Sequence, residues 1–363
     1  ASRESRLAMV QSEWIQAELL KLYPDCKVEI IGMTTRGDQI LDRPLAQIGG
    51  KGLFIKELEV ALEEGRADIA VHSMKDVPMT LPEGFAMAIV GARENVCDAL
   101  VSNHYKTLAD LPHGAMVGTS SLRRESQLRY HFSHLKIAPL RGNVNTRLKK
   151  LDDGQFDAII LAAAGLNRLG LGERVCATLS ADEFIPAIAQ GALGIEYRTD
   201  HPDFARWLAP FETPETTAMV CAERSLGRAL TGNCDVPLGG RACMLDGQLA
   251  LQGFVALPDG SRLIRDTIQG APGDCEQLGI ALADKLISHG AGEVLAAVAA
   301  GATQVAGFEQ ALIGHVGDEA GVFVVGVGGE VHHRAQHVEL LQPQQYFGGG
   351  VGFGRLSVCF NEQ

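Results

Sequence analysis

The segment ADIAVHSMKDVP, residues 67–78, places a short apolar run directly before a polar turn. The run at 68–73 is typical of a buried strand. A helical pattern at 54–64, ended by Gly65, precedes it, and a second buried strand at 85–91 follows it. A strand between a helix and another buried strand predicts an α/β sheet with helices on its faces.

The same alternation extends in both directions from this segment. Toward the N-terminus, an amphipathic helix is predicted at 7–22 and a strand at 27–33. After the polar residues 93–95 the alternation restarts, and the chain then predicts strands at 98–102, 115–118, 136–140 and 156–163 and helices at 120–131 and 144–151. This second group predicts a second α/β domain.

The rest of the chain has a different character. Residues 185–197 are predicted to cross back to the first domain, and a long helix at 214–230 opens a smaller α+β domain with short strands and a closing helix near 275–289. From about Val305 the periodicity weakens and glycines are frequent. We therefore expect domain 1 at 1–92 with 190–210, domain 2 at 96–186, domain 3 at 214–303, and a Gly-rich tail at 304–363.

The composition is that of a globular protein with an acidic balance. The net charge is −12 and aromatic residues make up 6% of the chain. Such a protein is a poor general binder of nucleic acid, so any anion must be bound in a local basic pocket. No apolar run approaches the roughly 18–20 residues of a membrane span, and the first residues lack the apolar core of a signal peptide. We expect no nucleic-acid or membrane partner.

The eight cysteines are scattered, without a CxxC pair or a spacing typical of zinc sites. Free thiols in a reducing cytosol are the simplest interpretation for seven of them, and we expect a cytoplasmic protein. Cys234 differs because it lies in the loop TGNCDVP. A thiol in an exposed loop is more nucleophilic than one in a core.

Two strand-to-helix junctions carry arginines. Arg123 and Arg124 follow the sequence GTSSL, and Arg141 and Arg147 lie in RGNVNTR. Helix N-termini attract anions, and arginine presents a planar fork that fits a carboxylate. The alternative is a pair of ordinary helix caps with solvated arginines. Because the arrangement occurs twice in one half-domain, a cleft that binds carboxylate or phosphate is favoured.

The turn HSMKDVP places Lys75 beside Asp76 at the end of a buried strand, where α/β folds hold ligands. A carboxylate next to a cation can stabilise developing positive charge or move a proton. From the residues alone, a solvated Lys–Asp turn is the favoured interpretation.

Two further motifs are weaker. The Gly-rich loop at 49–52 lacks the Gly-Lys-Ser/Thr ending of a Walker motif, so a flexible loop is favoured over a phosphate site. His332, His333 and His337 have no clear further ligand nearby, so a solvated surface is favoured over a metal site. We expect no metal.

Together these segments are similar to those of porphobilinogen deaminases (hydroxymethylbilane synthases), from Ala1 to about Gly301. The matching stretches are TRGD at 35–38, residues 49–56, ADIAVHSMKDVP at 67–78, VGTSSLRR at 117–124, LRGNVNTR at 140–147, DAIILAAAGLNRLG at 157–170, AQGALG at 189–194 and the cysteine loop at 232–237. So many matches in the same order leave little room for chance.

The resemblance implies two α/β domains like those of periplasmic-type binding proteins, with a cleft between them, and a smaller α+β domain that carries the cysteine. It implies one dipyrromethane cofactor per chain, joined to Cys234 by a thioether. It also implies a transferase of haem biosynthesis, which adds four porphobilinogen molecules to the cofactor with loss of ammonia and then releases hydroxymethylbilane by hydrolysis. A monomer is expected.

The resemblance also assigns site residues. Asp76 is the expected catalytic carboxylate, with Lys75 beside it. The residues expected at the cofactor are Cys234, Ser121, Arg123, Arg124, Lys75 and Asp76. Those expected at substrate carboxylates are Arg3, Ser5, Arg141, Arg147 and Arg168. Each pyrrole carries an acetate and a propionate, which accounts for an arginine-lined cleft in an acidic protein.

Two features depart from the family pattern. Gln47 stands where a lysine is frequent, which removes one positive charge from that loop, and the tail from about Val305 matches nothing in the family.

Two other classes of protein are weighed against the enzyme. A two-domain solute-binding protein fits the first two domains but needs no loop thiol, and a phosphate-loop nucleotide enzyme lacks its Walker ending.

Overall fold

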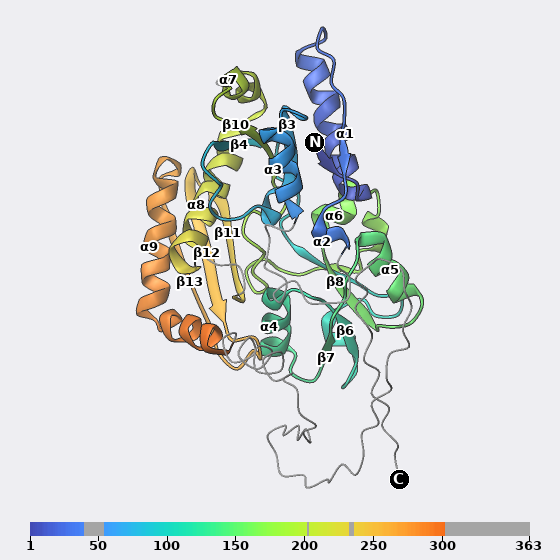
Figure 1. The fold of residues 1–363 in the computed structure, drawn as a ribbon. Coiled ribbons are helices and arrows are strands. Elements are labelled where there is room, and N and C mark those ends of the chain that lie inside the picture. The colour runs from blue at the N-terminus through green and yellow to red at the C-terminus, as the bar shows by residue number, and fades with distance from the viewer. Residues whose placement is uncertain (40–53, 202, 232–235, 302–363) are drawn as a thin grey trace, which may run out of the picture. The chain divides into compact units, whose positions relative to one another are not determined.

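The computed structural model describes residues 1–39, 54–201, 203–231 and 236–301 (Figure 1). Within these ranges the chain forms three larger sheets, each with its own helices, and one parallel strand pair. The predicted fold class, two α/β units followed by a smaller α+β unit, is confirmed. No helix in the same ranges is long and apolar enough to cross a membrane. The domain boundaries given above stay a prediction.

The first sheet is antiparallel and has the order β3-β10-β4. Its strands and the elements around it are β1 (Ser2–Arg3), α1 (Arg6–Leu22), β2 (Gly32–Met33), α2 (Arg36–Gln39), α3 (Lys56–Glu63), β3 (Ile69–Ser73), β4 (Phe85–Val90), β10 (Leu193–Arg198) and α7 (Asp203–Leu208). The segment predicted to cross back is β10, which pairs with both β3 and β4. Ile15 of α1 packs with Val71 of β3, and Leu58 of α3 packs with Ala70.

The strand predicted at 27–33 is wrong in length, because only Gly32 and Met33 form β2. Of the residues before β2, Lys27, Glu29 and Ile31 are exposed, and Val28 and Ile30 are only half-buried. Lys27 and Glu29 form an exposed ion pair instead of packing on the sheet. A strand needs a buried face to hold its register, and no residue from 27 to 31 is fully buried.

The second sheet has the order β7-β6-β8-β5-β9. Its elements are β5 (Asp98–Val101), β6 (Met116–Gly118), α4 (Leu122–His131), β7 (Lys136–Ala138), α5 (Val144–Asp152), β8 (Ala158–Ala162), α6 (Ala163–Arg168) and β9 (Ala177–Thr178). Every residue of β8 is buried. Ile160 packs with Leu128 of α4, while its neighbour Ile159 packs with Leu148 of α5, so helices cover both faces of this sheet.

The third sheet, β11-β12-β13, is antiparallel and is packed against two helices. Its elements are α8 (Pro214–Thr231), β11 (Leu238–Leu245), β12 (Gln248–Ala256), β13 (Leu263–Gly270) and α9 (Cys275–Ser288). The two helices approach closely at Gly279, where an added Cβ would lie 2.5 Å from that of Ser225. Helix α8 runs to Thr231, just before the cysteine loop.

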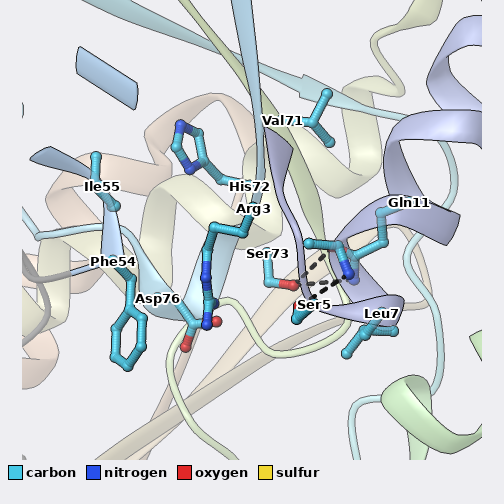
Figure 2. A pocket seen from close by; sticks show the side chains of 11 residues that line it. Arg3, Ser5, Leu7, Gln11, Phe54, Ile55, Val71, His72, Ser73 and Asp76 are labelled. Atoms are coloured by element: carbon cyan, nitrogen blue, oxygen red, sulfur yellow. Dashed lines mark hydrogen bonds between the residues drawn. The ribbon is translucent and has the colours of Figure 1, made fainter. Parts of the chain in front are cut away.

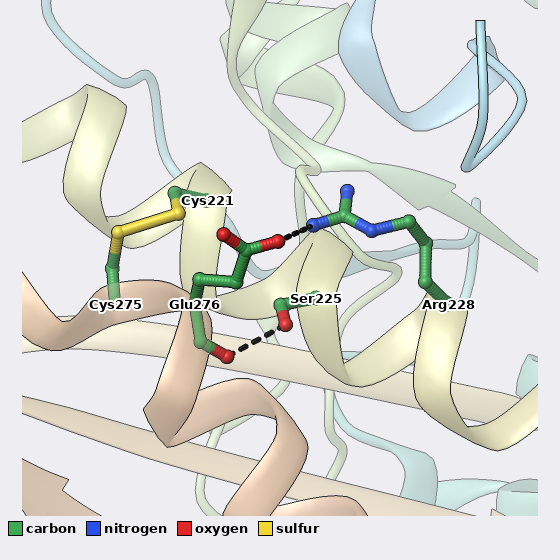
Figure 3. Close-up of a disulfide and its surroundings, with 5 residues drawn as sticks. All are labelled: Cys221, Ser225, Arg228, Cys275 and Glu276. Atoms are coloured by element: carbon green, nitrogen blue, oxygen red, sulfur yellow. Dashed lines mark hydrogen bonds and ion pairs between the residues drawn. A yellow bond between two sulfur atoms is a disulfide. The ribbon is translucent and has the colours of Figure 1, made fainter.

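Cys221 of α8 and Cys275 of α9 form a disulfide (Figure 3). The expectation of seven free thiols is therefore wrong for this pair, whose members are 54 residues apart in the sequence. The same two helices are joined by Glu276, whose backbone oxygen accepts from the Ser225 hydroxyl at 2.7 Å and whose carboxylate pairs with Arg228 at 3.3 Å. The free cysteines of the described ranges are Cys26, Cys97, Cys176 and Cys243.

Candidate functional site

The carboxyl end of β3 passes into a short 3-10 turn, Met74–Asp76, that carries two of the predicted site residues. Met74 is buried, and its backbone N–H donates to the carbonyl oxygen of Ala192 at 3.0 Å. Anchoring Met74 leaves Lys75 and Asp76 half-buried at the end of the strand. This is the position at which α/β sheets place ligand-binding residues.

A pocket lies beside this turn (Figure 2). Its polar lining comes from four elements and includes Arg3, Ser5, Gln11, His72, Ser73 and Asp76. The guanidinium carbon of Arg3 lies 4.3 Å from the centre of the Phe54 ring, within the range of a cation–π contact. The Ser5 hydroxyl also caps α1, because it accepts from the backbone N–H of Ala8 at 3.4 Å.

A second pocket adjoins the first and shares Gln11 and Ser73 with it. Lys75 and Arg168 are the cations in its lining. Arg168 donates from Nη2 to the carbonyl oxygen of Gly191 at 2.7 Å. Burial lowers the pKa of Arg168, and the nearby charge of Glu94 opposes that shift.

Lys75 has an unusual electrostatic environment for a lysine. Burial lowers its pKa to about 8. Asp76 opposes this shift, while the positive charge of Arg124 reinforces it. Lys75 therefore loses its proton at a pH only slightly above neutral, which makes its charge sensitive to what binds beside it.

Arg123 and Arg124 are almost fully buried and share one carboxylate, Asp98, which is 0% exposed. Arg123 donates from Nη2 to Asp98 Oδ2 at 2.7 Å, and Arg124 donates from Nη2 to Asp98 Oδ1 at 2.7 Å. Burial alone would raise the pKa of Asp98, but the two guanidinium groups outweigh it and hold the pKa at about 2. Two cations against one anion leave a net positive charge at the start of β5 in the second sheet.

Arg147 connects this cluster to the turn that bears Asp76. Burial and, to a smaller extent, the charges of Arg124 and Arg141 together lower the pKa of Arg147 to about 10, and the charge of Asp76 opposes this shift. Its Nε donates to the carbonyl oxygen of Gly142 at 2.8 Å. The two arginine motifs that the sequence singled out therefore lie in one electrostatic cluster with Asp76.

The helix caps that were weighed as the alternative at these motifs are present, but Arg123 and Arg124 are buried and not solvated as that alternative required. The Ser121 hydroxyl accepts from the backbone N–H of Arg124 at 3.4 Å and begins α4. Asn143 Oδ1 accepts from the backbone N–H of Thr146 at 2.9 Å and begins α5. The Ser121 hydroxyl therefore stabilises the start of α4, in addition to the role expected for it at the cofactor.

Several predictions fall outside the described residues. They concern Cys234, Gln47, the Gly-rich loop at 49–52, the histidines at 332, 333 and 337, and the tail. For Cys234, the nearest described residues in the sequence are Thr231, which ends α8, and Val236, two residues before β11 begins at Leu238.

Sequence reasoning missed the two side chains that organise the arginines. Asp98 was noted only as the first residue of a strand, although a carboxylate at the start of a buried strand is itself a signal of a buried partner. Gln190, noted only as part of the crossing segment, donates from Nε2 to Asp98 Oδ1 at 3.0 Å and to the carbonyl oxygen of Val96 at 2.8 Å.

Comparison with known proteins gives one consistent family. Residues 1–206 match the family model "Porphobilinogen deaminase, dipyromethane cofactor binding domain", and residues 217–288 match "Porphobilinogen deaminase, C-terminal domain". The porphobilinogen deaminase of Thiobacillus denitrificans is 62% identical over 300 residues, which are 83% of this chain and 98% of that protein. That of Chromobacterium violaceum is 60% identical over 300 residues, which are 83% of this chain and 97% of that protein.

Among solved structures, the methionine-binding protein MetQ is similar at 16% identity and a TM-score of 0.38, over 59% of this chain and 89% of that one. A likeness at that level carries no argument about ligand or function. The matched C-terminal domain and the high identity to named enzymes are not expected for a solute-binding protein or for a phosphate-loop nucleotide enzyme, so both alternatives are set aside.

Proposed function

This chain belongs to the porphobilinogen deaminase family, and we propose that Asp76 is its catalytic carboxylate and that Cys234 carries its cofactor through a thioether. The enzyme is a transferase of tetrapyrrole biosynthesis that uses a dipyrromethane cofactor. It condenses four porphobilinogen molecules with loss of ammonia and releases hydroxymethylbilane by hydrolysis. The bound dipyrromethane supplies the pyrrole carbon to which the first substrate is joined.

The cations of the site suit this substrate. Porphobilinogen bears an acetate and a propionate, and the charge of the product chain grows with each addition. Arg3, Arg141, Arg147 and Arg168 are proposed to bind these carboxylates, because they line the two pockets or lie in the cluster around Asp76. Lys75, which lines the second pocket and adjoins Asp76, is proposed to act with it in catalysis and to contact the carboxylates of cofactor or substrate. Ser5 is proposed to contribute a hydroxyl group to the substrate and Ser121 one to the cofactor.

Arg123 and Arg124 are proposed to act at the cofactor side of the site. Both are bonded to Asp98 and to backbone oxygens, namely those of Ile185 and Ile160. Their forks are thus rigidly held, and the excess positive charge that Asp98 leaves uncompensated favours an anionic group nearby. Such an arrangement suits the cofactor carboxylates.

The observation that carries the proposal for Asp76 is its place in the lining of the first pocket, close to several cations. It is the carboxylate in the lining of the first pocket, it adjoins Lys75, and it lies within electrostatic reach of Arg147. Departure of ammonia turns the substrate pyrrole into a cationic azafulvene. A carboxylate held beside the ring nitrogens stabilises that cation and can hold the proton that moves with ammonia.

Cys234 is proposed as the attachment point because of its loop. The motif GNCDVP follows α8, which ends at Thr231, and separates it from β11. Three of the other cysteines are poorer candidates, since Cys221 and Cys275 are bonded to each other and burial raises the pKa of the Cys97 thiol.

Intact mass and peptide mapping test the attachment. Wild-type protein purified from cells should carry a dipyrrole adduct on the peptide that contains Cys234, and Cys234→Ser should lack both the adduct and turnover. Cys243→Ser, which changes another free cysteine of the same region, is the matched control and should keep both. Normal turnover by Cys234→Ser without an adduct elsewhere would reject the attachment.

We further propose a cytoplasmic monomer without nucleic-acid or membrane partners. The net charge of −12 supports the absence of these partners, because an acidic surface repels both polyanions and anionic lipid. The cytoplasmic location is proposed from the four free thiols of the described residues, and the Cys221–Cys275 disulfide is the observation that opposes it. Sedimentation of the purified protein over a tenfold concentration range tests the monomer, and a mass that doubles with concentration would contradict it.

A further inference from the structure

Strand β3 is held on both of its faces immediately before the turn that carries Lys75 and Asp76. Successive side chains of a strand point to opposite faces. On the face covered by α1, the Ser73 hydroxyl and the Gln11 amide are bonded at 3.0 Å. On the other face, His72 Nε2 lies 2.8 Å from Glu196 Oε2 of β10. Figure 2 shows the His72 ring and the Ser73 hydroxyl leaving the strand on different sides.

The His72–Glu196 pair is deeply buried, with the two residues 5% and 0% exposed. Among the described residues, the second carboxylate oxygen, Glu196 Oε1, has no hydrogen-bond partner. A buried carboxylate in that condition is costly unless a positive or donating group lies beside it. His72 is the hydrogen-bond partner of this carboxylate. The need to stabilise the buried Glu196 side chain therefore explains why a histidine stands at position 72 and why its ring faces Glu196.

The charge of Glu196 is also felt on the helix above it. Burial and, to a smaller extent, the charges of Glu196 and Glu63 together raise the pKa of Glu59 of α3 to about 7, against the opposing charge of Lys56. A protonated Glu59 limits the negative charge under α3 near neutral pH. The Glu196 carboxylate therefore lies near other acidic groups, and His72 is the hydrogen-bond partner that it has among the described residues.

We propose that His72, held by Glu196, is a positioning residue for the condensation: their bond fixes the end of β3 and thereby the placement of Asp76 in the pocket. The inference rests on the proposed role of Asp76. A positioning role differs from a purely structural one, because the loss of His72 would lower kcat through Asp76. The arginines that are proposed to bind substrate carboxylates would stay in place.

Two substitutions separate these roles. His72→Gln keeps a donor near the position of Nε2, whereas the side chain of His72→Asn is too short to reach Glu196. We expect His72→Asn to lower kcat by at least about tenfold, since small misplacement of a catalytic group has effects of this size, and to change KM by less than about twofold. His72→Gln should recover a large part of the loss. His289→Asn is the matched control, because His289 Nδ1 contacts Asp266 at 2.9 Å in the third sheet's unit.

A double-mutant cycle then asks whether His72 acts through Asp76. In the Asp76→Glu background, which keeps the charge, His72→Asn should cost less than about twofold further in kcat. A kcat of His72→Asn within about twofold of wild type, or a full additional loss in that background, would overturn the inference. A near-normal kcat of Asp76→Asn would instead overturn the role of Asp76 itself, so the two failures are distinguishable.

Discussion

Arg93 donates from both terminal nitrogens to the carboxylate of Glu223, at 2.6 and 2.8 Å, and both side chains are almost completely buried. The same carboxylate accepts from the backbone N–H groups of Ala189 and Ala242, each at 2.6 Å. Arg93 precedes the second sheet, Ala189 precedes β10, and Ala242 lies in β11. One side chain of α8 therefore holds three parts of the chain that are distant in sequence.

We expect Glu223→Ala to lower the free energy of unfolding by about 3–5 kcal/mol, because it leaves a buried guanidinium without its partner. The loss is measured by urea unfolding. Glu125→Ala is the control, since Glu125 pairs with Arg129 on the surface and such pairs contribute less than about 1 kcal/mol. Equal losses in the two variants would contradict the importance of the buried pair.

Arg123→Leu and Arg141→Leu should separate stability from binding. Arg123→Leu removes one of the two cations of Asp98 but leaves the ion pair with Arg124, and we expect it to lower the free energy of unfolding by about 1–3 kcal/mol because Asp98 Oδ2 loses its donor. Arg141 is only half-buried, so Arg141→Leu should unfold near the wild-type temperature while assembling or extending the pyrrole chain poorly. Thermal unfolding and mass analysis of the bound chain check both. Similar stability of the two variants would show that Asp98 needs only Arg124.

Asp76 should act by its charge. Asp76→Asn is nearly isosteric, so it isolates the charge, and we expect kcat to fall by about 10²- to 10³-fold. Asp76→Glu should retain some activity, and KM should change less than kcat because the cation forms only after the substrate binds. Steady-state kinetics on cofactor-loaded protein measure this. An Asn variant within about threefold of wild type would mean that Asp76 only shapes the turn.

Lys75 should make substrate binding depend on pH. Its pKa in the folded protein is about 8, below the ordinary value of 10.5, so its positive charge is lost as the pH rises through 8. KM for porphobilinogen should therefore rise between about pH 7 and pH 9. Between these two pKa values the unfolded chain binds more protons at this site than the folded one, so the contribution of Lys75 to stability increases with pH over that range.

Lys75→Arg tests this pH dependence, because arginine keeps its charge throughout the range. The KM of Lys75→Arg should vary less with pH than that of wild type. If both proteins show the same rise, the dependence belongs to another group.

The Cys221–Cys275 disulfide should stabilise the unit formed by α8, α9 and the third sheet. It closes a long loop, and such a bond typically contributes about 2–4 kcal/mol. We expect a reductant to lower the melting temperature of wild type and to leave that of Cys221→Ser unchanged. The thioether proposed at Cys234 is not cleaved by reductant, so adduct mass should be the same before and after treatment. No shift in wild type would mean that the pair contributes little.

The sequence by itself determined the elements and the motifs. The apolar run at 68–73 and the turn that follows it predicted β3 with Lys75 and Asp76 at its end, because the residues that make a strand or a cap are neighbours in the chain. The strand-to-helix junctions before α4 and α5 belong to the same class.

Only the tertiary structure decided which charges are buried together. Asp98 binds Arg123, which is 25 positions away, and Arg124 next to it. Glu223 binds Arg93, which is 130 positions away. Cys221 is bonded to Cys275, which is 54 positions away. The local periodicity of the sequence carries no information about these contacts. They form because packing removes each group from water, and a buried charge or thiol is then stable only with the partner that the fold brings to it.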